Sequence, residues 1–195
     1  RVKALEQAKR EMALVAEIGG KRMAAPPCGP IGESSLDELG ERYATFLDGV
    51  EGTGVEPDLE LWGFAKRLFN LSELLYVASA AGQREVTLLL DTYQIYKGGG
   101  PFEPLALLNG KSLGGWHAND YPALPGRKEI ADPDRVFPGD GVAPLRNIYR
   151  TLHRIGYEGH LSLELFRQDY GSDDPLEVAR MGFEKTKRSV EMAFA

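Results

Sequence analysis

Four ionisable residues stand out because each lies near the end of an apolar segment that has the length of a β-strand. They are, in chain order, Glu60, Asp91, His117 and Glu164. Acids buried at such positions are costly unless they are paired or bound to a cation. Three carboxylates with one imidazole form a mixed oxygen and nitrogen set that suits Mn²⁺, Mg²⁺, Co²⁺ or Zn²⁺. We therefore predict a single divalent-metal site with these four residues as ligands.

Each of these residues, taken singly, has a simpler interpretation. An acid at a strand end more often caps a helix or forms a loop salt bridge, and a lone histidine on a strand is usually a hydrogen-bonded structural residue. The metal site is favoured because the four occur on consecutive predicted strands, in the order Glu, Asp, His, Glu.

Short apolar runs alternate with helix-like segments along the chain, which is typical of β/α units around a parallel sheet. The predicted strands are 21–27, 57–64, 84–91, 112–120 and 159–166. A helix ending at Gly19 comes first, and the later predicted helices are 36–49 (capped by Ser34 or Ser35), 69–82, 104–110, 142–157 and 174–194. This order fits an open doubly wound sheet or part of a barrel. In a barrel the carboxyl ends of all strands open on one face, where residues from several strands meet.

The bulk composition is that of an ordinary globular protein. The chain has 195 residues, 43% of them hydrophobic, and a net charge of −6. We expect a single domain over residues 1–195, and we expect no nucleic-acid partner because basic residues are scattered rather than clustered. The single cysteine, Cys28, excludes an intrachain disulfide and a cysteine-based zinc site and fits a cytoplasmic, reducing location. No apolar stretch is long enough to span a membrane.

Several segments together resemble one known superfamily. LELWGF (59–64), LLLDTYQIYKGGG (88–100), WHAND (116–120), DRVFPGDGVAPL (134–145) and LSLELF (161–166) are similar to the xylose isomerase-like TIM barrels. Within that superfamily, the segments look most like the sugar isomerase/epimerase branch. This branch includes hydroxypyruvate isomerases, ketose 3-epimerases, and inosose isomerases and dehydratases. The resemblance extends from about Met23 to the C-terminus.

The resemblance implies an α/β fold that is a partial (β/α)₈ barrel. In that family the four metal ligands lie on strands five to eight, so the strand at 21–27 would be strand four. The first three strands would then be missing from a chain that starts at Arg1 without a methionine. Such a fragment would leave unpaired edges on the strands at 21–27 and 159–166.

Two further site residues follow from the resemblance. The family commonly has Asp-x-x-His after its sixth strand, with the histidine touching the substrate, whereas this chain has Gln94 at that position. Arg135 resembles the family arginine that holds substrate oxygens. Glutamine cannot carry a proton charge at neutral pH, so no mechanism here can depend on a protonated side chain at position 94. The lack of that histidine and of a later Asp-x-His also argues against the three-zinc endonuclease branch.

The resemblance implies a metal-dependent isomerase or epimerase acting on a small polyhydroxy carbonyl substrate through a metal-stabilised enediolate. Glu60 and Glu164 would move protons, Asp91 and His117 would anchor the ion, and Gln94 and Arg135 would orient substrate hydroxyls. An inosose-type dehydratase with the same site, and a non-catalytic carbohydrate-binding relative, remain alternatives. Assembly into a homo-oligomer is left open.

Overall fold

Five parallel strands form the centre of the molecule. The computed structural model describes residues 2–29, 31–82, 85–167 and 173–195. The strands pair in chain order, β1-β2-β3-β4-β5, and each pairing is parallel. Their bounds are Arg22–Ala25 (β1), Glu56–Glu60 (β2), Thr87–Asp91 (β3), Leu113–His117 (β4) and Leu161–Ser162 (β5).

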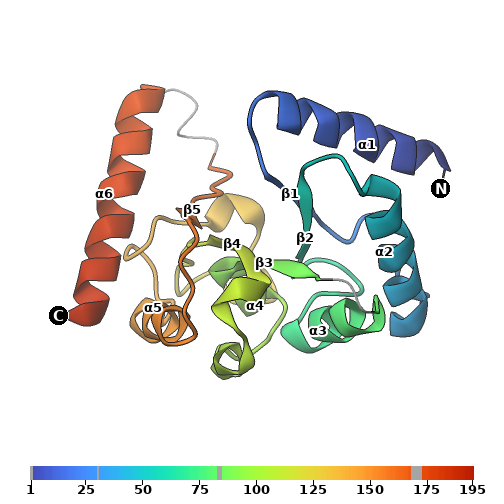
Figure 1. The fold of residues 1–195 in the computed structure, drawn as a ribbon. Coiled ribbons are helices and arrows are strands. Elements are labelled where there is room, and N and C mark those ends of the chain that lie inside the picture. The colour runs from blue at the N-terminus through green and yellow to red at the C-terminus, as the bar shows by residue number, and fades with distance from the viewer. Residues whose placement is uncertain (1, 30, 83–84, 168–172) are drawn as a thin grey trace.

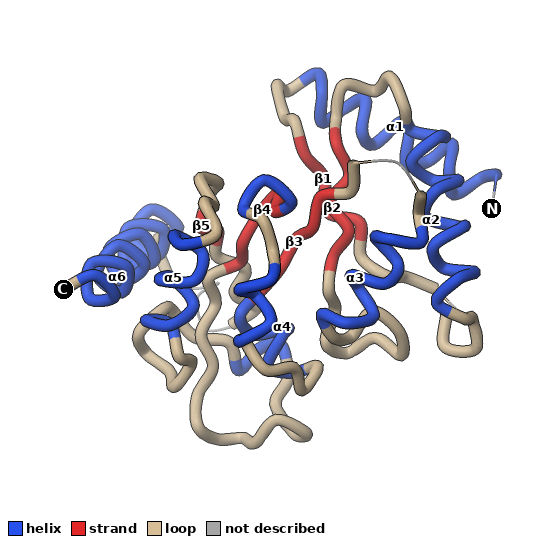
Figure 2. Tube along the Cα trace, turned by 60° about the horizontal axis from the view of Figure 1, so that its bottom comes forward, coloured by secondary structure: helices blue, strands red, loops and turns tan. Residues whose placement is uncertain are grey.

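Helices connect the strands and follow the last one. Their bounds are Val2–Glu17 (α1), Leu36–Val50 (α2), Leu71–Ala80 (α3), Thr92–Lys97 (α4), Leu145–Arg154 (α5) and Pro175–Phe194 (α6). Figures 1 and 2 show α1, α2 and α3 towards the β1 end of the sheet, with α5 and α6 towards the β5 end. No helix in the described part of the chain is long and apolar enough to cross a membrane.

The core lies between one face of the sheet and the helices. Alternate strand residues face it, as expected for a period of two. One buried cluster joins the strands to the helices. Its members include Leu59, Leu88, Leu90, Leu113 and Trp116 from the strands, Leu61 directly after β2, and Leu39, Leu74, Ile148 and Leu152 from the helices. The intervening strand residues point to the opposite, inner face. Glu60, Asp91 and His117 belong to that second set, so the packing of the core decides where they point.

The start of α2 shows how local chemistry fixes an element. Ser35 is the N-cap residue: its hydroxyl accepts a hydrogen bond from the Glu38 N–H, and the Glu38 carboxylate accepts one from the Ser35 N–H. This reciprocal pair satisfies two helix-end donors. The choice between Ser34 and Ser35 is thereby settled in favour of Ser35.

The structure corrects several predicted elements. The predicted helix at 104–110 is replaced by two 3₁₀ turns, Glu103–Leu107 and Gly110–Ser112, and the short helix α4 was not predicted. Residues Thr92 to Ile95 of α4 are all buried, polar and apolar alike, so the order of residue types shows no helical period. The last strand is much shorter than 159–166, because β5 pairs only with β4. The strand predicted at 84–91 begins at Thr87, and its first residue lies outside the described part.

The sheet forms a half-barrel rather than a closed barrel. Of the described strands, β1 pairs only with β2 and β5 only with β4.

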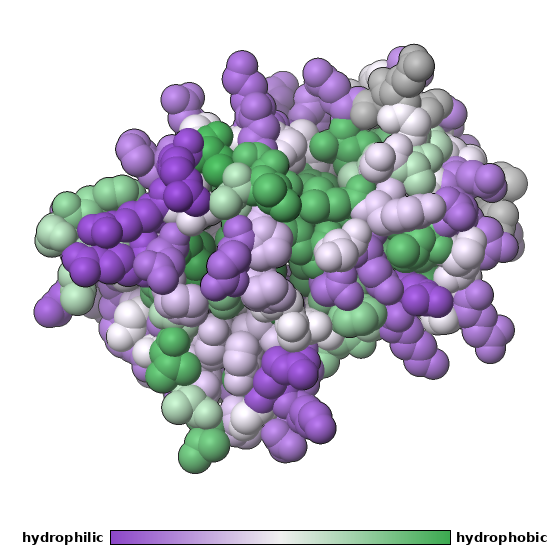
Figure 3. Space-filling model, turned by 90° about the horizontal axis from the view of Figure 1, so that it is seen from below, coloured by the Kyte–Doolittle hydropathy of each residue, from purple (hydrophilic) through white to green (hydrophobic). Residues whose placement is uncertain are grey.

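Figure 3 shows hydrophobic side chains across the middle of one face, between hydrophilic margins. Helix α6 contributes exposed apolar residues, among them Leu176, Phe183, Met192 and Phe194. The predicted α/β class with parallel strands is confirmed.

Candidate metal centre

The four predicted ligands come from the carboxyl ends of four neighbouring strands. Glu60, Asp91 and His117 are the last residues of β2, β3 and β4, and Glu164 follows the end of β5 by two residues. Asp91 and His117 lie directly opposite one another in the β3–β4 register. Since the strands are parallel and neighbouring, their carboxyl ends share one rim, as expected for a βα barrel.

Three of these side chains converge closely. Glu60, His117 and Glu164 each offer a ligand atom, and these atoms all lie within 4.8 Å of one another. Nδ1 of His117 is 3.3 Å from Oε2 of Glu164 and 3.7 Å from Oδ2 of Asp91. Asp91 is therefore next to the cluster through His117, although it is not one of the three most closely grouped residues.

Asp91 is almost fully buried and its oxygens are already engaged. Oδ1 accepts a 2.6 Å hydrogen bond from the Tyr93 N–H and so caps helix α4. Oδ2 accepts hydrogen bonds from Asn119 at 2.8 Å and from Arg135 at 3.3 Å. A carboxylate oxygen has about two lone-pair sites, so Oδ2 could bind a cation only if the longer of these two contacts, that with Arg135, gave way.

Arg135 enters the cluster from the long loop after β4. Its Nη1 donates to Oε2 of Glu164 at 2.7 Å and to Oδ2 of Asp91, while Nε and Nη2 both donate to Asp132. The guanidinium also lies over the rings of Tyr93 and Phe166, at 4.6 Å and 4.9 Å from their centroids. Arg135 is only 1% exposed, so it is a built part of the site rather than a solvated loop charge.

The convergence of these charges shifts their proton affinities in opposite directions. Burial and repulsion from Glu164 raise the pKa of Glu60 to about 7. Burial alone would raise the pKa of Glu164, but the neighbouring imidazole of His117 and the hydrogen-bonded guanidinium of Arg135 outweigh it and lower that pKa to about 2. Burial alone would lower the pKa of His117, but the carboxylates of Asp91 and Glu164 raise it to about 9. Two carboxylates with pKa values pushed apart are typical of acid and base partners.

A divalent metal fits this set of residues. Nδ1 of His117 is buried and has no hydrogen-bond partner among the described residues, although two carboxylates lie beside it. An unpartnered buried nitrogen is costly, and coordination of a cation would satisfy it. Imidazole with carboxylates is a donor set that borderline divalent ions accept.

Gln94 lies at the same rim but is held by another contact. Its Oε1 accepts a 2.8 Å hydrogen bond from the Gly63 N–H in the loop after β2, and the residue is 2% exposed. The structure gives no contact between Gln94 and the four predicted ligands. Because its oxygen is engaged, the amide nitrogen is the group left to donate a hydrogen bond.

Two buried residues that sequence reasoning did not assign organise the site. Asn119 donates to Asp91, and its Oδ1 accepts a 2.9 Å hydrogen bond from the Glu164 N–H, so it ties β3 to the segment after β5. The Asp120 carboxylate accepts hydrogen bonds from the N–H groups of Tyr121, Gly139, Gly141 and Ala143. Their signal in the sequence was a pair of adjacent polar residues just after Ala118, in WHAND.

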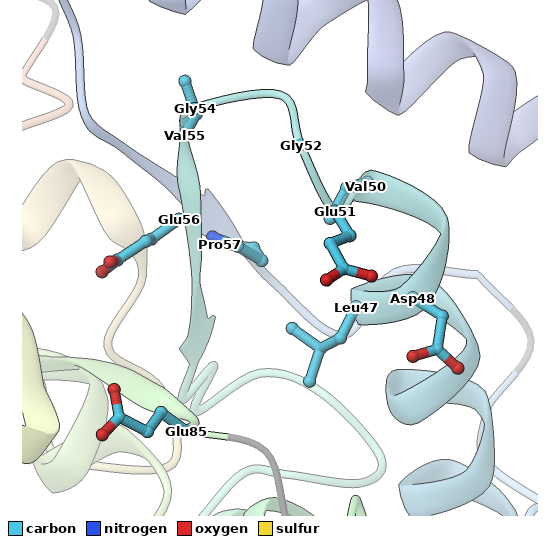
Figure 4. Close-up of a pocket in the computed structure, with 10 residues that line it drawn as sticks. All are labelled: Leu47, Asp48, Val50, Glu51, Gly52, Gly54, Val55, Glu56, Pro57 and Glu85. Atoms are coloured by element: carbon cyan, nitrogen blue, oxygen red, sulfur yellow. The ribbon is translucent and has the colours of Figure 1, made fainter.

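A large pocket lies elsewhere in the molecule. It measures about 760 Å³ and lies between the end of α2 and the start of β2, at the amino ends of the strands. Figure 4 shows its acidic side chains, Asp48, Glu51, Glu56 and Glu85, spread around the pocket rather than pointing to a common centre. In βα barrels the chemistry lies at the opposite, carboxyl rim, so this pocket does not compete with the metal centre.

Comparison with known proteins places the chain in a family. The model of the xylose isomerase-like TIM barrel family matches residues 1–189, which is nearly the entire chain. This chain belongs to the xylose isomerase-like TIM barrel family. The predicted superfamily is thereby confirmed.

Relatives in this family include the inosose isomerases of bacilli. That of Bacillus velezensis is 28% identical over 195 residues, a match that spans 97% of this chain and 69% of the relative. That of Bacillus subtilis is 32% identical over 141 residues, which is 72% of this chain and about half (49%) of the relative.

Solved structures of other proteins share the fold. The IolI protein, in a crystal structure with a bound zinc atom, superposes with a TM-score of 0.87 at 24% identity and covers 97% of this chain and 70% of its own. An L-ribulose 3-epimerase gives a TM-score of 0.71 at 18% identity, over 98% of this chain and 68% of the epimerase. At these identities the likeness shows the fold alone.

Proposed function

We propose that this chain carries the metal centre of an isomerase or epimerase that acts on a small polyhydroxy carbonyl compound, a keto-inositol or a ketose. The observation that carries the proposal is the convergence of Glu60, His117 and Glu164 within 4.8 Å at the carboxyl rim. Membership of the xylose isomerase-like family and the inosose isomerase relatives support the substrate class.

Glu60, His117 and Glu164 would hold the ion, with Asp91 as the fourth ligand. A divalent ion bound there supplies polarisation of a substrate carbonyl and so acidifies the neighbouring C–H group. The donor set accepts Mn²⁺, Mg²⁺, Co²⁺ or Zn²⁺. A zinc atom in the related IolI protein supports a divalent ion without fixing which one serves here.

Proton transfer is assigned to the two glutamates. Glu164, whose carboxylate accepts a hydrogen bond from Arg135, would take a proton from the carbon next to the carbonyl. Glu60, the other glutamate of the cluster, would return a proton to the adjacent carbon or to the other face of the same carbon. The electron pair of the broken C–H bond passes to the carbonyl oxygen and back, which gives isomerisation or epimerisation without a redox partner.

Arg135 and the free amide nitrogen of Gln94 would orient the substrate oxygens. Arg135 is suited to this because its contacts with Asp132, Tyr93 and Phe166 fix the plane of its guanidinium. Gln94 can donate but cannot exchange a proton, so it is assigned to binding alone.

The test is proton exchange in heavy water. The purified protein with Mn²⁺ is incubated in D₂O with a keto-inositol or a ketohexose, and products are followed by NMR. We expect an isomeric product labelled with deuterium at the reacting carbon. Glu164→Gln should lower turnover by roughly 10²- to 10⁴-fold, because a positioned acid–base group contributes that much. The control, Glu184→Gln, changes an exposed acid on α6 and should be neutral.

Other outcomes separate the alternatives. Loss of water from the substrate would indicate a dehydratase that uses the same centre. Metal binding without any deuterium exchange would contradict enzymatic function and indicate a carbohydrate-binding protein. If Glu164→Gln binds metal and keeps near-normal turnover, Glu164 has no part in proton transfer.

We further propose that the five strands are strands four to eight of an eight-stranded barrel. Support comes from the unpaired edges of β1 and β5 and from the exposed apolar residues of α6, which further β/α units would cover. The genomic sequence ahead of the Arg1 codon tests this. Three more β/α units in frame are expected, and an unrelated domain there would contradict the proposal.

A further inference from the structure

Strand β4 contains an irregularity directly below the metal centre. Leu88 of β3 pairs with Leu113 of β4, but the next residue, Leu89, pairs with Gly115, so that Gly114 is an extra, unpaired residue. The alternation of β4 breaks at the same place. Leu113 and Trp116, three residues apart, both lie in the core between the sheet and the helices. These are the features of a β-bulge.

The bulge decides which side chain of β4 reaches the centre. Because side chains alternate, one extra residue transfers every later side chain to the other face. With the bulge, Asp91 lies opposite His117, and the imidazole points to the carboxylates. In an uninterrupted register from the Leu88–Leu113 pair, Asp91 would lie opposite Trp116. An indole would then occupy the inner face, and His117 would point into the core.

The bulge is held by charged residues from two other strands. The carboxylate of Asp58, on β2, lies against Gly114: a β-carbon at Gly114 would be 1.9 Å from Oδ1 of Asp58. Arg22, on β1, donates from Nε to the Gly114 carbonyl at 3.3 Å and lies 3.5 Å from Oδ2 of Asp58. Asp58 is only 4% exposed, so its carboxylate cannot swing into solvent to make room.

We propose that Arg22, Asp58 and Gly114 form a positioning device that fixes the β4 bulge and thereby turns His117 into the metal centre. The proposal rests on the proposed function for the role of His117 as a metal ligand. The bulge itself is a feature of the strand pairing and does not depend on that role. Only glycine fits at position 114, and the ion pair keeps the extra residue in place. The three are positioning residues and touch neither ion nor substrate.

The test compares two glycines one residue apart in β4. Gly114→Ala places a methyl group on the Asp58 carboxylate, whereas Gly115→Ala meets only the flexible end of Leu89, at 3.0 Å. We expect Gly114→Ala to weaken Zn²⁺ binding, measured by calorimetry, at least tenfold, and Gly115→Ala to weaken it less than threefold.

A second readout needs no metal. In a Trp62→Phe background, Trp116 is the remaining tryptophan, and it is fully buried. Loss of the bulge moves its indole towards the inner face, so Gly114→Ala should shift its fluorescence to longer wavelength, while Gly115→Ala should not. Unchanged Zn²⁺ affinity and unchanged fluorescence in Gly114→Ala would overturn the inference.

Asp58→Asn keeps the side-chain shape and tests the ion pair if Gly114→Ala does not fold. Three- to tenfold weaker Zn²⁺ binding supports the device, and wild-type affinity removes Asp58 from it. If the unchanged protein binds no Zn²⁺ or other divalent ion, the proposed function fails. The fluorescence of Trp116 then tests by itself whether Gly114 is needed for the β4 bulge.

Discussion

Arg135 is the residue whose placement bears most on the chemistry of the site. Its Nη1 bonds to Asp91 and Glu164, two of the four proposed ligands, and it is the cation that the structure places between them. This explains how acids can gather at a buried rim, since paired buried charges are tolerated where single ones are not. It also means that a bound metal ion and the Arg135 guanidinium would contact the same two carboxylates, those of Asp91 and Glu164.

Removal of the Arg135 charge should therefore strengthen metal binding while it impairs catalysis. Arg135→Met keeps much of the side-chain volume, and we expect roughly tenfold tighter binding of Zn²⁺, because repulsion between two cations a few ångströms apart is lost. Turnover should fall at least ~10-fold with the loss of the oriented guanidinium. Calorimetry and steady-state kinetics measure the two effects. Arg146→Met, at an exposed arginine, is the control, and weaker metal binding in Arg135→Met would contradict the argument.

Asn119 should affect metal affinity without touching the metal. It is fully buried and orients both Asp91 and the backbone of Glu164. Residues that orient metal ligands typically contribute about 10- to 100-fold in affinity, and we expect a loss in that range for Asn119→Ala. Titration with Zn²⁺ measures it, with Asn147→Ala on exposed helix surface as the control. An affinity within twofold of wild type would show that Asp91 needs no such support.

At the scale of elements, the loop between β4 and α5 is what brings Arg135 to the rim. The loop is folded back by Asp120: its carboxylate accepts four backbone hydrogen bonds, and its own backbone pairs with Val136, the neighbour of Arg135. Helix α4 plays a similar part on the other side, since Asp91 caps it and Tyr93 lies under the guanidinium. These hydrogen bonds and contacts fix the conformation of the loop and thereby the position of Arg135.

Asp120→Asn should release this loop. The amide can accept at one oxygen only, and its NH₂ group would face the N–H groups of Gly139 and Gly141. The loss of two charge-assisted hydrogen bonds should cost about 2–4 kcal/mol of stability. Hydrogen exchange should rise in residues 136–143, and KM should rise as Arg135 loses its place. The exposed Asp140→Asn is the control, and unchanged exchange in the Asp120 variant would contradict this role.

At the scale of the whole molecule, the metal centre joins separate strands of an open sheet. Its residues come from β2, β3, β4 and the segment after β5, so a bound ion would link most of the width of the sheet. The same positions concentrate negative charge at a buried rim, and burial together with repulsion from Glu164 raises the pKa of Glu60 to about 7. A cation at the centre should therefore stabilise the fold as well as activate the site.

Metal should raise the melting temperature of the protein. A ligand that binds only the folded state at a hundred times its Kd stabilises it by about 2.7 kcal/mol. We expect Zn²⁺ or Mn²⁺ to raise the Tm in a thermal melt and EDTA to reverse the change. The double variant Glu60→Gln with His117→Gln should show no metal-dependent shift. An equal shift in that variant would place the ion outside the proposed centre.

The four candidate ligands and the β/α order could be predicted from the sequence alone. Glu60, Asp91, His117 and Glu164 could be found because each follows an apolar run, and such runs report burial and strand ends locally. The boundaries were less accurate where a segment is buried on all sides, as in α4, or where it has one neighbour only, as in β5.

The tertiary structure alone decided how these residues meet. The extra residue at Gly114, the loop held by Asp120 and the placement of Arg135 each depend on pairing between strands or on contacts between distant segments. Such pairings leave no period in a single segment of sequence, because register is a relation between two strands. Residue types therefore determined which groups are available for chemistry, and the packing of the sheet and its loops determined which of them face one another.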